Sequence, residues 1–426
     1  MMNYKLPFTK EFGYIRLSEI LKPGSAKFNE VMDTFEDIER VNSLTLKEWI
    51  ESRILNTAEL ARINRISNEH IYNVIKYCKF NDIRIITPED AEYCRNFRYI
   101  ENPPVVLYAR GKMLDESAPA IGIVGARKCT EFGQKAAYSL GAKLALSGFT
   151  VISGGAVGVD GMAHLGAMNA GGNTVVVLGC GLDAKYLMAQ DSLRKRAELC
   201  GTVVSEFEPK TPATRYTFPI RNRIISAMSC GVAVIEAGQK SGALITATYA
   251  MEQGKEIFAL PGNINAPQYG GTNDLLRDGA TPLVKVEDIT EVYMGRFPDK
   301  LKTGVELSPE IKRGYYEEAA RLSKPKMGKD NSKFDVKKDE SPTPKTADLK
   351  NEKPKQKELS LTSEENLNCS ENAKKIYLSF IENIEFSDIL SERSGVKGGE
   401  FIAAITELEL FGFIKAVPVG RYERIK

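Results

Sequence analysis

The feature that most constrains the fold is a series of short apolar runs, each followed directly by a turn of small or polar residues. The five clearest runs begin at residues 120, 150, 174, 231 and 256. They are rich in valine and isoleucine and too short for helices, so each is predicted to be a buried parallel strand. Most segments between them, such as 134–147 and 160–169, have helical periodicity. This alternation predicts an α/β fold with helices on both faces of an open, mainly parallel sheet.

The chain of 426 residues is long enough for two or three domains. Residues 1–85 have helical periodicity and predict a small helical module, which precedes a core at 86–295. Residues 296–368 are expected to form a tail and a linker. From 323 onward Lys, Glu, Asp, Pro, Ser and Thr dominate, which predicts disorder. Residues 369–426 have the pattern of three helices and a β-ribbon, which predicts a winged helix.

Charge and composition argue against several classes of protein. The formal net charge is +2 and the pI about 8.0, so any phosphate site must be local. Seven cysteines without a Cys-x-x-Cys pair argue against a disulfide framework, and only two histidines, His70 and His164, argue against a histidine-rich metal site. No apolar run approaches the roughly 20 residues that span a bilayer. We therefore expect a cytoplasmic protein without a membrane segment.

The ligand site is expected beyond the carboxyl ends of the strands, where open parallel sheets bind their ligands. The sequence places glycines, hydroxyls and several cations there, which favours an anionic ligand. One group is the turn with Ser153, Gly154, Gly155 and Gly158. Its glycines let the backbone approach an oxyanion, and the helix start supplies N–H donors. Tight turns also use glycine for geometry alone, so this motif by itself decides little.

Cationic residues occur directly after the first core strand and in the first turn of a later predicted helix. Arg127 and Lys128 come directly after the strand, where phosphate contact is preferred over a solvated surface pair. Arg221 and Asn222 lie in the first turn of a predicted helix, where a cation opposes the helix dipole. A residue that breaks a local rule without structural gain is a candidate for function. Phe218 is a candidate for stacking on bases, although an aromatic ring also suits the core.

Two further turns lie on the same side of the predicted sheet. One carries Lys240, Ser241 and Gly242, with Thr246 a turn later. Ser241 suits a helix N-cap and the amides after it suit an anion, but a simple capped helix fits the same residues. Gly262 and Asn263 end the next strand.

A catalytic constellation is harder to find. The chain lacks the Gly-x-x-x-x-Gly-Lys-Ser/Thr pattern of ATP-hydrolysing loops, and no serine or cysteine pairs plausibly with a histidine base. The carboxylates Asp160, Asp183, Glu206 and Glu236 show no recognisable pairing. Asp160 suits the first turn of a helix, and His164 suits packing. We therefore expect a binding protein with no catalytic residue, cofactor or metal.

Five motifs resemble those of DNA-processing protein A (DprA, also called Smf), a bacterial family. They are Ile123-Val-Gly-Ala-Arg127, Ser153-Gly-x-Ala-x-Gly158-Val-Asp160, Phe218-Pro-x-Arg-Asn-Arg-Ile-Ile-Ser226, Glu236-Ala-x-x-x-Ser-Gly-x-Leu-x-Thr-Ala247 and Leu260-Pro-Gly262. All occur in order within residues 120–284, so the resemblance is specific.

The resemblance implies an extended Rossmann-like core that binds single-stranded DNA without marked sequence preference. It also implies a homodimer that loads the recombinase RecA onto incoming strands during natural transformation. Arg127, Arg221, Asn222 and Arg223 would then hold the DNA backbone, with the turns at 153–158 and 241–242 beside them. A C-terminal winged helix belongs to the same resemblance.

The chain departs from the family pattern at two places. Val157 stands where the family's glycine turn usually has an arginine, and Tyr186-Leu187 stands where it has Tyr-Pro. The missing cation predicts weaker DNA affinity, or compensation by Arg215 or Lys240.

Two other functions stay open at this point. One is an enzyme of the phosphoribohydrolase type on a related fold, although Leu260-Pro-Gly-Asn-Ile lacks the Pro-Gly-Gly-x-Gly-Thr-x-x-Glu pattern with its working glutamate. The other is a winged-helix regulator of duplex DNA. It is disfavoured because the third C-terminal helix carries Glu400, Glu407 and Glu409 and few cations.

Overall fold

The computed structural model describes residues 9–113, 115, 117–185, 191–323, 369–380, 384–417 and 421–425. The chain divides into two compact units, Met1–Lys337 and Lys338–Lys426, and each is described by itself.

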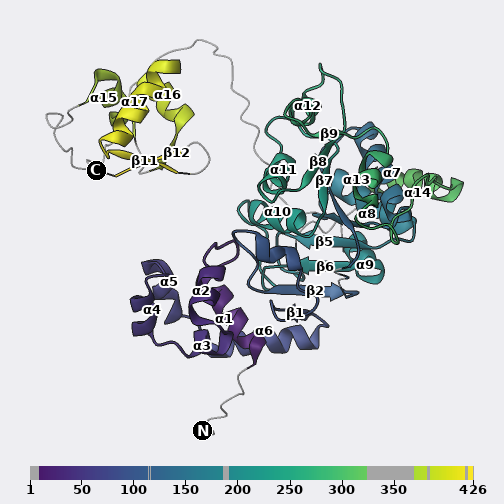
Figure 1. The fold of residues 1–426 in the computed structure, drawn as a ribbon, viewed down its shortest axis with the longest axis horizontal. Helices are drawn as coiled ribbons and strands as arrows, with labels where there is room; N and C mark the ends of the chain where they lie inside the picture. Colours follow the sequence, from purple (N-terminus) through teal and green to yellow (C-terminus); the bar gives the residue numbers. More distant parts are fainter. Residues whose placement is uncertain are drawn as a thin grey trace, which may run out of the picture. The chain divides into compact units, whose positions relative to one another are not determined.

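A nine-stranded sheet organises the first unit, with the strand order β1-β2-β6-β5-β4-β3-β7-β8-β9 (Figure 1). The strands are β1 (Arg84–Ile86), β2 (Leu107–Gly111), β3 (Ala120–Val124), β4 (Thr150–Ser153), β5 (Thr174–Leu178), β6 (Thr202–Ser205), β7 (Gly231–Val234), β8 (Glu256–Ala259) and β9 (Thr281–Pro282). The strands from β6 to β9 in this order pair in parallel, whereas β2 pairs antiparallel with both β1 and β6. The predicted α/β fold with a mainly parallel sheet is confirmed.

Two hydrophobic cores lie on the two faces of the sheet, because successive side chains of a strand point to opposite sides. In β3, Ile121 and Ile123 belong to one core, while Ala120 and Val124 belong to the other. The first core contains residues of α7 (Glu131–Leu146), α8 (Val159–Asn169), α9 (Asp191–Cys200), α13 (Glu287–Met294) and α14 (Pro309–Ser323). The second contains residues of η1 (Arg95–Tyr99), α10 (Thr217–Ala227), α11 (Gly242–Glu252) and α12 (Gly270–Arg277).

The order of the strands creates a topological switch point at β3. The chain runs outward through β4, β5 and β6, and then returns to place β7 on the other side of β3. The connections after β3 and after β7 leave on opposite faces, so a crevice opens at the carboxyl ends of these two strands. Open α/β sheets bind their ligands in such a crevice.

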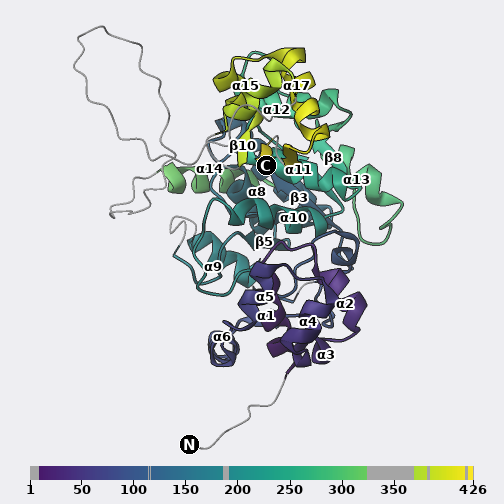
Figure 2. The ribbon, with the colours of Figure 1, turned by 90° about the vertical axis from the view of Figure 1, so that its left-hand side faces the viewer.

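From residue 9 onward, six helices precede the sheet and form one group at one side of the core (Figures 1 and 2). They are α1 (Lys10–Leu21), α2 (Phe28–Phe35), α3 (Ile38–Ser43), α4 (Leu46–Ser52), α5 (Thr57–Ile63) and α6 (Asn68–Phe80). Capping boxes start α4 and α5, at Thr45 and Asn56. Helices α1 to α5 share a core that includes the buried Trp49, whereas Ile71, Val74 and Cys78 of α6 belong to the first core of the sheet. The predicted helical module is confirmed.

The described residues of the second unit, within 369–425, form three helices and a small antiparallel sheet of order β10-β12-β11. Its elements are α15 (Glu371–Leu378), β10 (Ile384–Phe386), α16 (Ser387–Ser394), α17 (Gly398–Leu410), β11 (Ile414–Val417) and β12 (Arg421–Arg424). Ile376, Leu390 and Leu408 are buried in its core. The three predicted helices and two predicted strands are present in that order, but β10, between α15 and α16, was not predicted. The assignment as a winged helix stays a prediction.

Some elements were not foreseen from the sequence. Strands β1, β6, β9 and β10 were missed, and α14 lies in the segment expected to be a tail. The predicted disordered linker at 324–368 lies outside the described residues, as does Tyr186-Leu187. The domain boundaries remain predictions.

None of the helices in the described part of the chain is long and apolar enough to cross a membrane.

Candidate functional site

A pocket of about 270 Å³ lies at the switch point. Its walls come from segments far apart in sequence: the turn after β3, the start of α8, one side of α10 and the first turns of α11. The lining residues are Val124, Gly125, Arg127, Ala156, Asp160, Phe218, Arg221, Asn222, Ile225, Ser241, Gly242, Ala243 and Thr246. Seven of the predicted site residues are therefore brought together: Arg127, Phe218, Arg221, Asn222, Ser241, Gly242 and Thr246.

Arg127 is an exposed cation on the rim of this pocket. Its guanidinium carbon lies 4.8 Å from the centre of the Phe218 ring, so the ring supports the charge in a cation–π contact. Gly158 permits the close packing of the turn below it. Its φ is +84°, and a Cβ there would lie 2.5 Å from the carbonyl oxygens of Ala126 and Arg127. Lys128 is exposed next in the chain but does not line the pocket.

Arg221 forms a recessed part of the pocket, with only 5% of the residue exposed. Its Nη1 donates a hydrogen bond to the carbonyl oxygen of Val177 in β5. A Cβ on Gly154 would collide with the guanidinium, so glycine at 154 is a condition for this placement. Gly154, in the glycine turn, therefore leaves the space that the Arg221 side chain occupies.

Asp160 is the acidic residue of the pocket, and sequence reasoning did not select it. It lies in the first turn of α8 and is buried. Burial raises the pKa of its carboxyl, while the charges of Arg221 and Arg127 act in the opposite direction. The sequence pointed to Asp160 only through its place at the end of the glycine turn. It was not selected, because a carboxylate in the first turn of a helix is common for structural reasons. Two arginines against one carboxyl leave the pocket suited to an anion.

The start of α11 closes another side of the pocket. Ser241 caps the helix, its side chain accepting a hydrogen bond of 3.3 Å from the Ala243 backbone N–H, as predicted. Asn222 donates a hydrogen bond of 3.4 Å from Nδ2 to the Gly242 carbonyl oxygen, so α10 and α11 are joined beside the pocket. Thr246 lines the same wall but is almost completely buried.

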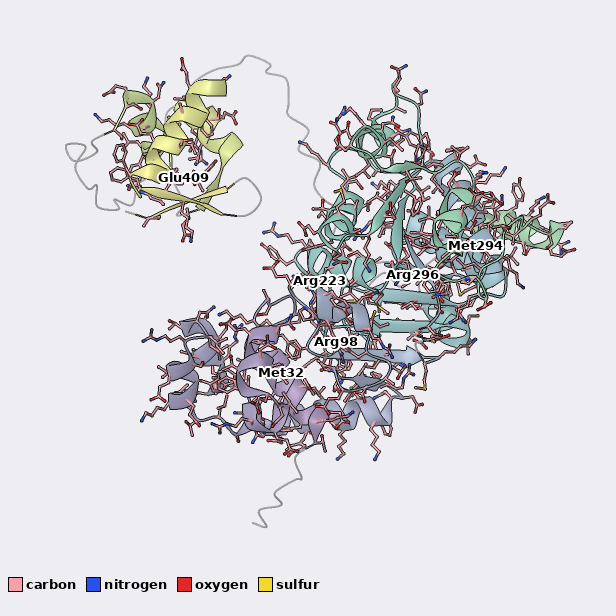
Figure 3. All side chains as sticks on the ribbon, in the orientation of Figure 1. Met32, Arg98, Arg223, Met294, Arg296 and Glu409 are labelled. Atoms are coloured by element: carbon pink, nitrogen blue, oxygen red, sulfur yellow. The ribbon has the colours of Figure 1, made fainter. Side chains whose placement is uncertain are left out.

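Arg223, which was predicted to contact DNA, does not line the pocket. Its side chain is completely buried, and Nη2 donates hydrogen bonds of 2.8 and 2.9 Å to the two carboxylate oxygens of Glu206. Figure 3 shows Arg223, like Met32 and Arg98, where the N-terminal helices meet the core. Arg223 is therefore a structural residue, because an anion cannot reach it without repacking of the protein.

Ser153 is also structural. It is fully buried, and its hydroxyl donates a hydrogen bond of 2.6 Å to the Ile123 carbonyl oxygen, which ties β4 to β3. Gly154 and Gly155 are buried as well, so this turn shapes the pocket and offers no side-chain ligand.

The remaining predicted residues lie outside the pocket. Arg215 and Lys240 are exposed, and the Arg215 guanidinium lies 4.7 Å from the ring centre of the exposed Tyr216. Gly262 and Asn263 line a separate, open hollow of about 370 Å³. Gly262 and Asn263 are therefore not part of the pocket that the other predicted residues line.

Three of the carboxylates that seemed unpaired in the sequence have partners. Glu206 pairs with Arg223, Asp183 pairs with Arg110 at 3.0 Å, and Glu236 accepts hydrogen bonds from Thr130 and Tyr269. His164 is buried, as predicted, with Nδ1 2.6 Å from the Thr174 hydroxyl. Within the described residues, no group of three or more His, Cys, Asp or Glu side chains is arranged to hold a metal ion.

The fold and the site together define a Rossmann-like α/β protein with an arginine-lined pocket at the switch point. Comparison with known proteins identifies the family. The model of the family described as DNA recombination-mediator protein A matches residues 84–294, which include every residue of the pocket.

Curated relatives and a solved structure agree with this match. DNA processing protein DprA of Bacillus subtilis is 38% identical over 265 residues, which cover 58% of this chain and 89% of that protein. Protein Smf of Escherichia coli is 30% identical over 343 residues, or 80% of this chain and 77% of the relative. The X-ray structure of DNA processing protein A (DprA) from Streptococcus pneumoniae has a TM-score of 0.59 and 28% identity, covering 67% of this chain and 98% of that one. The chain therefore belongs to the DNA recombination-mediator protein A family.

Proposed function

We propose that this protein binds single-stranded DNA without marked sequence preference, and that the pocket at the switch point holds the DNA backbone. The observation that carries the proposal is the convergence of Arg127 and Arg221 on one pocket at the carboxyl ends of the strands. Arginine suits bidentate contact with phosphate. Membership of a family described as recombination mediators, with relatives named DNA processing proteins, supports DNA as the source of that phosphate.

The shape of the pocket favours a single strand over a duplex. Arg221 is recessed, so a phosphate must enter the pocket to reach it, and a flexible strand enters more easily than a stiff double helix. Aromatic rings lie beside this path: Phe218 under Arg127, and Tyr216, which is 64% exposed at the start of α10. Unpaired bases stack on such rings with little regard to sequence.

The proposal includes the role of a mediator. We infer that the protein acts as a homodimer in the cytoplasm and loads RecA onto the bound strand during natural transformation. Two measurements test these parts separately: the mass of the protein in solution, and the rate at which RecA assembles on a strand coated by a single-strand-binding protein. A monomeric mass would contradict the homodimer. A RecA assembly rate that is the same with and without this protein would contradict the role in loading.

One observation favours an enzymatic alternative. Asp160 is a buried carboxyl with a raised pKa in the proposed anion pocket, and such groups serve as acids or bases in nucleotide-cleaving enzymes. We propose a non-enzymatic role, because among the described residues that line the pocket no histidine, cysteine, lysine, tyrosine or second carboxylate accompanies Asp160 for proton transfer. Incubation with nucleoside monophosphates, followed by assay for released base, separates the two functions. Release of base that is lost in Asp160→Asn would establish the enzyme.

The test of the proposed function is binding of a labelled oligo-dT and of its duplex counterpart. We expect the single strand to bind much more tightly than the duplex. Equal or tighter binding of the duplex would instead support the alternative of a duplex-binding regulator. In that case the C-terminal unit becomes the site to test, despite the acidic Glu400, Glu407 and Glu409 of α17.

A further inference from the structure

A second pocket, of about 290 Å³, lies at the opposite edge of the sheet. Its walls include Ala120, Thr150, Thr174 and Thr202, with which β3, β4, β5 and β6 begin. None of its lining residues belongs to the pocket at the switch point. This edge also carries the end of β2, because β2 runs antiparallel to its neighbour β6.

Cations outnumber acids around this second pocket. Among the described lining residues are Arg95, Lys112 and Arg296, against one carboxylate, Asp115. Asp115 is engaged within its own turn, accepting hydrogen bonds from the Ser117 N–H at 2.9 Å and the Ser117 hydroxyl at 2.6 Å. These hydrogen bonds lower the pKa of Asp115, so the carboxylate is ionised but already supplied with donors. The excess of cations among the described lining residues favours an anion.

Two of the cations stand on well-anchored backbone. Lys112 follows β2; its N–H donates to the Gly201 carbonyl oxygen at 2.8 Å, and its own carbonyl oxygen accepts from the Thr202 hydroxyl at 2.7 Å. Arg296 follows α13, and its guanidinium carbon lies 5.2 Å from the centre of the Phe297 ring. Figure 3 labels Arg296. In the described part of the chain, neither side chain forms an ion pair with an acidic residue.

The rest of the lining combines apolar surface with amides. Ile152, Val175, Met228 and Phe297 supply the apolar surface. Asn96 is held in place by a hydrogen bond of 3.1 Å from Nδ2 to the Ala227 carbonyl oxygen, and Asn173 lies in the same lining. Apolar surface packs against a nucleobase, and asparagine side chains hydrogen-bond base edges. Cations, amides and apolar surface are together the requirements of a nucleotide.

We propose that this pocket is a second binding site, specific for a nucleoside 5′-monophosphate. Lys112 and Arg296 hold the phosphate, and the base packs against the apolar lining. The volume is near the lower end of small-molecule sites, roughly 300 Å³, and suits one nucleotide unit. A free nucleotide and the 5′-phosphorylated end of a DNA strand share this chemistry. The site does not depend on the proposed function of the first pocket.

Equilibrium dialysis of the full-length protein with labelled AMP tests the proposal. We expect one AMP to bind per chain, and binding about tenfold weaker in Lys112→Gln and in Arg296→Gln, since each loses a charged phosphate contact. Both side chains are exposed, so the fold should persist, which thermal unfolding verifies. The matched control is Arg127→Ala at the other pocket, which should bind AMP normally. Absence of AMP binding to the unaltered protein would overturn the proposal, and so would loss of binding in Arg127→Ala alone.

Competitors identify the source of the ligand. Displacement of AMP by a 5′-phosphorylated oligo-dT, but not by the same oligo with a 5′-hydroxyl, would support the site and assign it to strand ends. Displacement by neither oligo would support it as a site for the free nucleotide. Displacement by both oligos alike would place AMP in the strand-binding pocket and overturn the proposal. Equal affinity for AMP and inorganic phosphate would also overturn it, because the base would then contribute nothing.

Discussion

Arg221 and Arg223 belong to the same helix, α10, yet one lines the pocket at the switch point and the other is buried in an ion pair with Glu206. A helix turns by roughly 100° per residue, so side chains two positions apart point in nearly opposite directions. The Gly24 N–H, in the loop between α1 and α2, donates to Glu206 at 3.4 Å. The Glu206–Arg223 pair therefore joins the N-terminal helices to the helix that presents Arg221.

Arg223→Ala is expected to destabilise the protein by about 3–5 kcal/mol, because it leaves the Glu206 carboxylate buried without its partner. Urea unfolding measures the loss, and the exposed Arg98→Ala serves as the control, with a change within about 0.5 kcal/mol. Replacing both members, as Glu206→Leu with Arg223→Met, should recover much of the stability. A stable Arg223→Ala protein with impaired DNA binding would restore Arg223 as a ligand and contradict the structural role.

Gly154→Ala is expected to weaken binding of oligo-dT roughly tenfold, a loss of ~1.4 kcal/mol. The added methyl group collides with the Arg221 guanidinium and displaces it from the pocket. Gly295→Ala is the matched control, because a Cβ at 295 meets no atom within 4 Å. Affinity for oligo-dT that is unchanged in Gly154→Ala would show that the position of Arg221 does not matter for binding.

Tyr216→Ala is expected to reduce affinity for oligo-dT by ~1–3 kcal/mol, the loss of one stacked base, without lowering stability. Tyr216 is exposed beside Arg215 at the start of α10. Tyr99→Ala provides a control, since Tyr99 is another highly exposed tyrosine and lies on η1, outside the pocket. Equal effects of the two variants would mean that the strand does not pass over Tyr216 specifically.

His164 is expected to make stability depend on pH. Burial lowers the pKa of its imidazole from 6.5 to about 3, so the folded protein keeps it neutral. Above pH 6.5 neither state binds the proton; between about 6.5 and 3 only the unfolded chain does, so this contribution destabilises the fold as pH falls. His164→Gln should therefore flatten the pH profile of the unfolding free energy by up to ~1.4 kcal/mol per pH unit. Parallel profiles for the two proteins would rule out this role.

The strands that could be predicted from the sequence are those with the clearest runs of apolar, mostly β-branched residues. The five runs rich in valine and isoleucine became β3, β4, β5, β7 and β8, because β-branched residues suit strands that are buried on both faces. Strand β6 was missed, since its run Thr202–Ser205 is brief and polar at both ends. The two-residue β9 offers almost no pattern to detect.

The candidate site was predicted in part, for a similar reason. Strand-end turns mark which segments meet at the switch point, so Arg127, Arg221 and Ser241 were selected correctly as neighbours. The sequence did not indicate in which direction each side chain points. Arg223 belongs to the same motif as Arg221, but its side chain is buried beside Glu206. The second pocket lies at the amino ends of the strands, where the strand-end rule gives no reason to search.

The central claim is that the switch-point pocket holds the backbone of single-stranded DNA, and a salt series tests it most directly. Binding of oligo-dT is measured by fluorescence anisotropy for the unaltered protein, Arg127→Ala and Arg98→Ala. We predict weaker binding in Arg127→Ala, with a slope of log affinity against log salt that is shallower by about 0.7, the value for one lost phosphate contact on a single strand. Arg98→Ala should match the unaltered protein. An unchanged affinity and slope in a folded Arg127→Ala protein would contradict the claim.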